Sequence, residues 1–138
     1  MDKCKIIEDD IGFLKYIGAE VIDCDNGTAE LAFEIKPHHK QHMGVVHGGA
    51  IATLADHTGW YAVVSLLDDG YTSATIELKT NFLKPANGEV LKAVAKVVNK
   101  TKRTVFATIE VFAKDTLVAY STGTYAIIDE TKFIKKDS

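Results

Sequence analysis

The stretch that decides the fold is HGGAIATLAD, residues 47–56, which opens an apolar segment that continues to residue 67. The apolar residues of this segment do not form one narrow stripe at helical spacing. We therefore expect a helix over residues 47–67 that is buried on most sides. Asp68-Asp69-Gly70 is expected to end it, because glycine readily adopts the left-handed conformation of a helix C-terminus.

The sequence on both sides of this helix is typical of β-strands. Residues 21–35 predict a hairpin, in which Asn26-Gly27 supplies the positive φ angles of a type I′ turn. Further strands are expected at residues 71–82, 90–99, 104–114 and 117–128, where the third alternates strictly between apolar and polar residues. Their short connections favour antiparallel pairing. The predicted fold is α+β, a curved antiparallel sheet wrapped around one long central helix.

Composition places the 138 residues in one globular domain, with an N-terminal helical segment within residues 1–18 and a loose charged tail at 129–138. A net charge of −3 gives no electrostatic case for nucleic acid or an anionic membrane as a partner. Neither a secretion signal nor a membrane-spanning helix is indicated. Cys4 and Cys24 lack C-x-x-C spacing, so no disulfide framework is expected, and a reducing cytoplasmic location fits.

Gly48 and Gly49 stand at the start of the predicted helix. The first N–H groups of a helix have no internal partner, and the helix dipole favours negative charge there. These residues therefore form either an anion or oxyanion site or simply a turn that lets the helix pack closely. The glycine pair alone leaves both interpretations open.

Asp56 is the unusual residue of this helix, because it lies inside a helix that is otherwise expected to be buried. Burial of an unpaired carboxylate costs several kcal/mol or raises its pKa. The residue is therefore either a functional carboxylate or a hydrogen-bonded structural one. Gly49 and Asp56 are seven residues apart, which places them on one helix face roughly 10 Å apart along the axis. A second, antiparallel copy of the helix would bring the Gly49 of one subunit near the Asp56 of the other, which indicates a site shared within a symmetric dimer.

Residues 41–56, together with Thr75 and the segment NFLKPA at 81–86, resemble the PaaI-type branch of the hotdog-fold acyl-CoA thioesterases. The similarity of layout covers about residues 20–128. The resemblance implies a hotdog fold and hydrolysis of an acyl-CoA to a carboxylic acid and free coenzyme A. It further implies that no cofactor is used, that a homodimer is the active unit and that two dimers form a homotetramer.

The resemblance also implies a role for individual residues. Asp56 would be the nucleophile or the general base, and the N–H of Gly49 would polarise the thioester carbonyl, with Gly48 shaping the turn. Thr75 stands where relatives have a Ser or Thr that orients water. Gln41 stands where many relatives have Asn, which is a departure from the pattern. His47 would anchor the loop and contact the substrate.

Basic residues are concentrated between residues 79 and 103, a segment with seven Lys or Arg residues and a single acidic residue, Glu89. This excess of positive charge predicts a binding site for the phosphates of coenzyme A, although solvent-exposed strand faces explain the same pattern. The residues assigned to the substrate are Lys84, Lys100, Lys102 and Arg103. The five histidines match no zinc spacing, so no metal is expected.

Two other functions remain open at this stage. A hotdog dehydratase or hydratase needs an acid/base pair, which Asp56-His57 could supply. A non-catalytic acyl-CoA-binding protein would explain the departure at Gln41. Release of a free thiol separates a thioesterase from both.

Overall fold

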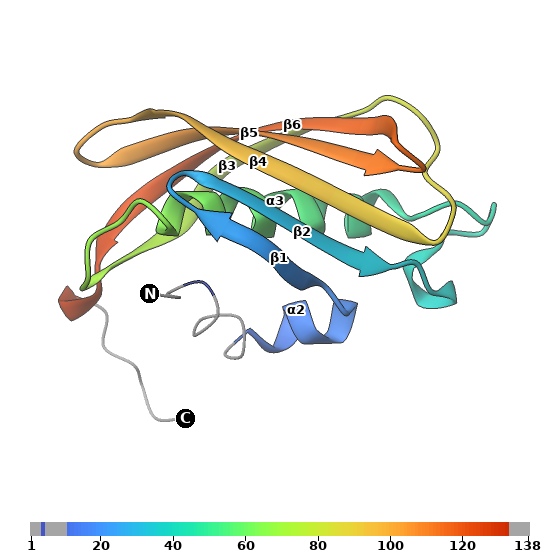
Figure 1. The fold of residues 1–138 in the computed structure, drawn as a ribbon, viewed down its shortest axis with the longest axis horizontal. Coiled ribbons are helices and arrows are strands. Elements are labelled where there is room, and N and C mark those ends of the chain that lie inside the picture. Colours follow the sequence, from blue (N-terminus) through green and yellow to red (C-terminus); the bar gives the residue numbers. More distant parts are fainter. Residues whose placement is uncertain (1–3, 5–10, 133–138) are drawn as a thin grey trace.

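The apolar segment forms α3 (Gly48–Val64), which lies against one face of a six-stranded antiparallel sheet (Figure 1). This computed structural model describes Cys4 and residues 11–132. The sheet curves around the helix, so the predicted layout of a sheet wrapped around one long helix is confirmed. Nine residues of α3 are buried, among them Leu54, Tyr61 and Val64, as expected for a helix apolar on most sides.

The helix ends at Val64, three residues before the predicted boundary, and Ser65 is its C-cap. The Ser65 hydroxyl donates to Ala62 O at 2.7 Å and accepts from Gly27 N at 2.8 Å, which ties the helix end to the first hairpin turn. Gly70 does have a left-handed φ of 88°, but it lies at the entry to β3 rather than at the helix cap.

The strands are β1 (Glu20–Asp25), β2 (Thr28–Glu34), β3 (Tyr71–Phe82), β4 (Val90–Lys100), β5 (Thr104–Ala113) and β6 (Thr116–Asp129). All pairs are antiparallel, in the order β1-β2-β4-β5-β6-β3. The hairpin between β1 and β2 turns at Asn26 and Gly27, whose φ angles are 47° and 86°, so the predicted type I′ geometry is confirmed.

The position of β3 differs from a simple meander. Strands β4, β5 and β6 follow one another as predicted, but β3 pairs with β6 at the far edge of the sheet, and residues 83–89 cross back to β4. This leaves β3 beside α3, where Trp60 Nε1 donates to Ser73 O at 2.7 Å. A sequence pattern of strands does not encode which of them are neighbours in the sheet.

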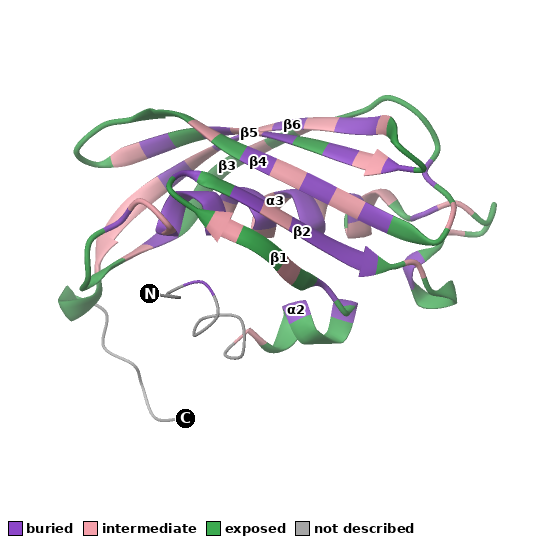
Figure 2. Cartoon of the chain, viewed as in Figure 1, coloured by how far each residue is buried: buried purple, intermediate pink, exposed green. Residues whose placement is uncertain are grey.

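The core lies between α3 and the sheet. Figure 2 shows that buried residues alternate with more exposed ones along the strands. In β5 the alternation follows the prediction, with every second residue buried: Val105, Ala107, Ile109, Val111 and Ala113. Within the described residues, no helix is long and apolar enough to span a membrane.

Both ends of the described chain carry short helices. The predicted N-terminal helix is α2 (Gly12–Ile17), and the rest of the expected segment, other than Cys4, lies outside the described residues. At the other end β6 runs to Asp129 and the 3₁₀ turn η2 (Glu130–Lys132) follows, held by Thr131 N donating to Asp129 Oδ1 at 2.9 Å. Regular structure thus extends four residues into the expected tail, and residues 133–138 lie outside the described part.

The two cysteines form a disulfide, which corrects the expectation from their spacing. Cys4 and Cys24 are bonded, with their Cα atoms 6.3 Å apart. The bridge links the N-terminal segment to β1, and its formation depends on where that segment lies rather than on any sequence motif. Cysteine usage therefore no longer favours a reducing compartment.

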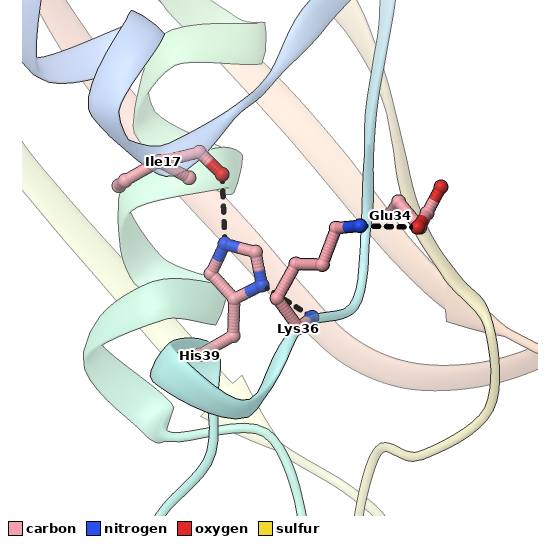
Figure 3. A network of polar contacts seen from close by, with 4 residues as sticks. All are labelled: Ile17, Glu34, Lys36 and His39. Atoms are coloured by element: carbon pink, nitrogen blue, oxygen red, sulfur yellow. Dashed lines mark hydrogen bonds and ion pairs between the residues drawn. The ribbon is translucent and has the colours of Figure 1, made fainter.

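His39, in the 3₁₀ turn η1 (Pro37–His39), is buried and joins α2 to the end of β2 (Figure 3). Its Nδ1 accepts from Lys36 N at 2.9 Å, so Nε2 carries the proton and donates to Ile17 O at 2.7 Å. The neutral ring stacks on Phe33 at a centroid distance of 4.1 Å. Figure 3 also shows the surface ion pair between Lys36 and Glu34.

This arrangement predicts acid sensitivity. Burial lowers the pKa of His39, while its hydrogen bond to Ile17 acts in the opposite direction. Because the folded-state pKa lies below the unfolded value of about 6.5, the unfolded chain binds more protons between the two values. The His39 contribution is fully present above about pH 6.5 and is lost as the pH falls toward the folded-state pKa. Urea unfolding at pH 7.5 and 5.5 should show a weaker pH dependence in His39→Gln than in wild type, with His42→Gln as the exposed control. Equal pH dependence in wild type and His39→Gln would contradict this.

Candidate active site

The start of α3 is capped by its own histidine. His47 is the N-cap, and its Nδ1 accepts from Gly49 N at 2.8 Å. The main chain of His47 is fixed as well, because its N–H donates to His39 O at 2.8 Å. The N–H of Gly49, expected to be available for a substrate, is therefore already in a hydrogen bond in this structure.

Gly48 N–H, in contrast, makes no hydrogen bond within the part of the chain that the structure describes. It lies beside a cleft of about 360 Å³ formed by the loop before α3 and by residues 82–86. The Phe82 ring covers Gly48 closely, since a Cβ at that position would lie 3.4 Å from the ring. This cleft brings together three residues that the sequence assigned to the site: Gln41, Gly48 and Lys84.

Gln41 is partly engaged in the turn of its own loop. Its main-chain N–H donates to Val45 O at 2.9 Å, its carbonyl accepts from Gly44 N at 3.0 Å, and its side-chain Oε1 accepts from Met43 N. The side-chain oxygen thus holds the loop, and the NH₂ group is the part of the amide left to face a ligand.

Asp56 forms the second part of the site, together with Thr75. The Thr75 hydroxyl donates to Asp56 Oδ1 at 2.8 Å, which fixes one oxygen of the half-buried carboxylate toward β3. A bulge follows at once, because the register of β3 against β6 shifts between Thr75 and Glu77. Such bulges often re-aim a side chain next to a functional site. The structure thus brings together Asp56 and Thr75, two residues that the sequence assigned to the site.

The third part is a basic cleft of about 830 Å³ at the C-terminal end of α3. Lys100, Lys102 and Arg103, all exposed, line it together with Lys132. Apolar side chains from the end of the helix and from β6 form much of the remaining wall, and two carboxylates also contribute: Leu66, Leu67, Ile127, Ile128, Asp68 and Asp129.

These three parts follow one another along α3 and β3, which run side by side in opposite directions. Contacts link Gly48 to Phe82, Asp56 to Thr75 and Trp60 to Ser73 in that order along the helix. The Asp56 carboxylate therefore lies between the glycine-containing cleft and the basic cleft. The chain does not bring Asp56 and Gly49 together, because two helical turns separate them by roughly 10 Å.

His57, next to Asp56, is half-buried, and burial lowers its pKa, although the charge of Asp56 acts in the opposite direction. The imidazole is therefore neutral near pH 7. Successive helix residues point about 100° apart, so the two side chains are not aimed at one point. Within the described residues, no three His, Cys, Asp or Glu side chains gather as metal ligands would.

Sequence reasoning did not single out Tyr125, whose hydroxyl donates to the main-chain carbonyl of Asp56 at 3.2 Å. Two glycines could have pointed to it. Gly59 lies inside a helix and Gly123 inside a strand, positions where glycine weakens the element and often marks a close approach. A Cβ at either position would collide with the Tyr125 side chain.

Comparison with known proteins agrees with this geometry. Residues 43–120 match the model of the family described as the thioesterase superfamily. A protein provisionally named an esterase, from Saccharolobus solfataricus, is 32% identical over 117 residues, or 84% of this chain and 77% of that protein. A 1,4-dihydroxy-2-naphthoyl-CoA hydrolase from Listeria monocytogenes is 23% identical over 94 residues, 68% of this chain and 76% of the hydrolase. A mutant of the phenylacetic acid degradation protein PaaI from Thermus thermophilus superposes with a TM-score of 0.77 at 26% identity, over 84% of this chain and 98% of that one.

The chain belongs to the thioesterase superfamily, with a hotdog fold. Within the superfamily it is of the PaaI type, so the resemblance predicted from residues 41–56, 75 and 81–86 is confirmed. Membership places the chain among the thioester hydrolases.

The cap on α3 yields a stability prediction. His47→Ala removes the acceptor for Gly49 N–H, and loss of an N-cap side chain costs about 1 kcal/mol. Urea unfolding at pH 7.5 should show this decrease relative to wild type. His42→Ala, an exposed histidine of the same loop, is the matched control and should change the free energy of unfolding by less than about 0.5 kcal/mol. Equal unfolding midpoints for the two variants would show that the cap contributes nothing.

Proposed function

We propose that the protein hydrolyses acyl-CoA thioesters to a carboxylic acid and free coenzyme A, with Asp56 as its catalytic carboxylate. The observation that carries this proposal is the Asp56 carboxylate itself, half-buried on a helix that packs largely in the core and hydrogen-bonded to Thr75. The position of Asp56 along α3, between the cleft that contains Gly48 and the basic cleft, supports this role.

Two routes lead from Asp56 to the same products. As a general base, the carboxylate takes a proton from water, the resulting hydroxide attacks the carbonyl carbon, the C–S bond breaks, and the thiolate of coenzyme A takes the proton. As a nucleophile, the carboxylate attacks the carbonyl carbon and expels the thiolate, and water then hydrolyses the acyl anhydride. Single turnover in H₂¹⁸O identifies the second route when water attacks the Asp56 carbonyl of the anhydride, because only then does ¹⁸O enter the Asp56 side chain and the first acid product carry no ¹⁸O.

The thioester carbonyl is proposed to lie at the start of α3, where the helix dipole favours the negative charge that develops on oxygen. Gly48 N–H is the donor that has no partner in the described structure, and Gly49 N–H joins it when the His47 imidazole turns away. Thr75 and the Gln41 amide are proposed to orient water and substrate. Lys84, in the same cleft as Gly48, is proposed to contact the substrate.

The basic cleft is proposed to hold the phosphates of coenzyme A. Lys100, Lys102 and Arg103 lie there with Lys132, beyond the end of α3 and roughly 12 Å along the helix axis from Asp56. A long, flexible pantetheine arm connects the nucleotide of coenzyme A to its thioester, so the two ends can occupy separate clefts. The naphthoyl-CoA hydrolase among the relatives supports this substrate class. A cytoplasmic location is proposed with it.

A homodimer is proposed as the active unit, with two dimers forming a tetramer. The stripe of α3 that carries Gly49 and Asp56 is not covered by the sheet, and β3 is an edge strand with exposed apolar residues such as Ile76. A second copy packed on this face by two-fold symmetry would cover both and bring its glycine pair to Asp56.

The first test of the function is removal of the charge on Asp56. Asp56→Asn keeps the size of the side chain, and loss of general base or nucleophile should lower kcat by about 10²–10⁴-fold. Thiol release is measured with phenylacetyl, benzoyl, short-chain and long-chain acyl-CoAs, and Asp69→Asn, an exposed aspartate after the helix, serves as the control.

Near-normal turnover by Asp56→Asn would rule out this role. Binding of acyl-CoA without thiol release by the wild-type protein would instead favour a non-catalytic acyl-CoA-binding protein. Formation of a hydrated or dehydrated acyl-CoA, with no thiol released, would favour the dehydratase that Asp56-His57 kept open.

The second test addresses the basic cleft. Replacing Lys100, Lys102 and Arg103 together by Ala should raise KM for acyl-CoA about tenfold, because three exposed charge contacts of about 0.5 kcal/mol each sum to roughly one factor of ten. A truncated acyl thioester of N-acetylcysteamine carries no phosphates, so its kcat/KM should stay unchanged. Lys92→Ala, on the outer face of the sheet beside Phe112, is the control. An unchanged KM for acyl-CoA, or an equal loss with the truncated thioester, would move the phosphate site elsewhere.

A further inference from the structure

Tyr125 is a buried tyrosine whose hydroxyl reaches the helix turn that carries Asp56. It lies in β6 with no exposed surface, and its Oη donates to the main-chain carbonyl of Asp56 at 3.2 Å. That carbonyl already belongs to the hydrogen-bond ladder of α3. The tyrosine therefore adds a tertiary hydrogen bond to one particular turn of the helix.

Two glycines make the slot that holds this side chain. A Cβ at Gly59 would lie 2.2 Å from Tyr125 Oη, and a Cβ at Gly123 would lie 2.7 Å from Tyr125 Cε1. Glycine inside a helix costs about 1 kcal/mol relative to alanine. Gly59, a residue of low helix propensity, thus lies on α3 at the point where the Tyr125 hydroxyl approaches the helix.

The same tyrosine is tied to the residue that holds the carboxylate. Tyr125 pairs directly with Thr75 across β6 and β3, and Thr75 donates to Asp56 Oδ1 at 2.8 Å. One cross-strand pair therefore fixes Asp56 twice, with Tyr125 on its main chain and Thr75 on its side chain. Directly opposed residues of antiparallel strands project to the same face of the sheet, which is why both reach the helix.

The hydroxyl stays protonated at any working pH. Burial raises the pKa of Tyr125 far above its usual range, and the negative charge of Asp56 and a hydrogen bond to it act in the same direction. Tyr125 therefore serves as a permanent donor toward Asp56 and is not a candidate acid or base.

We propose that Tyr125 is a positioning residue for the reaction, which sets the orientation of Asp56 through the hydrogen bond from its hydroxyl to the Asp56 main chain. This inference rests on the proposed function of Asp56. A change in the placement of a reacting group of about 1 Å can cost as much as 10²-fold in rate, so a hydrogen bond that fixes one helix turn affects kcat more than it affects binding.

Tyr125→Phe tests the proposal, because the ring continues to fill the slot and only the hydroxyl is lost. We expect kcat for acyl-CoA to fall about tenfold or more, with KM within about twofold of wild type. Tyr61→Phe is the matched control, since Tyr61 is an equally buried tyrosine on α3. It should leave kcat unchanged.

A double variant separates positioning from general damage. In an Asp56→Asn background, Tyr125→Phe should cause no further loss of the residual turnover, because there is no carboxylate left to orient. A further loss in that background would assign Tyr125 a structural role only. A wild-type kcat for Tyr125→Phe, alongside an inactive Asp56→Asn protein, would overturn the proposal and leave the proposed function intact. Activity in Asp56→Asn would overturn the function itself.

Gly59→Ala provides an independent route if Tyr125→Phe does not fold. The added methyl group displaces the Tyr125 hydroxyl while the tyrosine remains, so a selective loss of kcat is expected again. Circular dichroism would establish that the variant is folded. An unchanged kcat in folded Gly59→Ala would overturn the proposal.

Discussion

Burial of α3 in the concave face of the sheet is the constraint on which the other features depend. Its buried face supplies large apolar side chains such as Leu54 and Val63, each worth about 1.5–3 kcal/mol when removed from water. A helix enclosed in this way has only one stripe left for chemistry. Gly49, Asp56 and Trp60 lie on that stripe, so the packing that stabilises the fold also determines where a reactive group can stand.

The edge position of β3 follows from the same constraint. β3 packs along the side of the helix next to this stripe, where Ser73 and Thr75 are hydrogen-bonding partners of Trp60 and Asp56. Had β3 remained beside β4, these residues would lie away from Asp56. The crossing of residues 83–89 back to β4 also places Phe82 and Lys84 at the start of α3. The topology thus positions the site as much as the helix does.

Much of the fold could be predicted from the sequence, because periodicity and turn chemistry are local signals. Asn26-Gly27, the alternation in β5 and the apolar run of α3 each identify an element with little ambiguity. Strand neighbours are a property of the whole chain, so the place of β3 could not be read locally. The bond between Cys4 and Cys24 is of the same kind, since it depends on the path of the N-terminal segment.

The candidate site divides in the same way. Asp56 and Thr75 were each selected from a family pattern of residue types, but the hydrogen bond between them was not predicted. The hydrogen bond between His47 and Gly49 depends on the rotamer of the His47 side chain. The hydrogen bond between Tyr125 and Asp56 joins residues that are 69 positions apart in the sequence. Neither can be predicted from a local pattern. Only Gly59 and Gly123 gave an indirect signal for the Tyr125 contact. Glycine inside a helix or strand lowers the stability of that element, so its presence there often marks the close approach of another group.

The His47 cap has a consequence for how the proposed carbonyl site would favour the transition state. A substrate carbonyl that takes Gly49 N–H exchanges one neutral hydrogen bond for another, so little is gained when the thioester first binds. Once negative charge develops on the oxygen, the same N–H forms a charge-assisted bond, which is about twice as strong as a neutral one. The imidazole cannot match this, because a neutral acceptor carries no such charge. An occupied donor at the start of α3 would therefore weaken binding of the ground state while retaining its benefit for the tetrahedral oxyanion, and that difference is what accelerates a reaction.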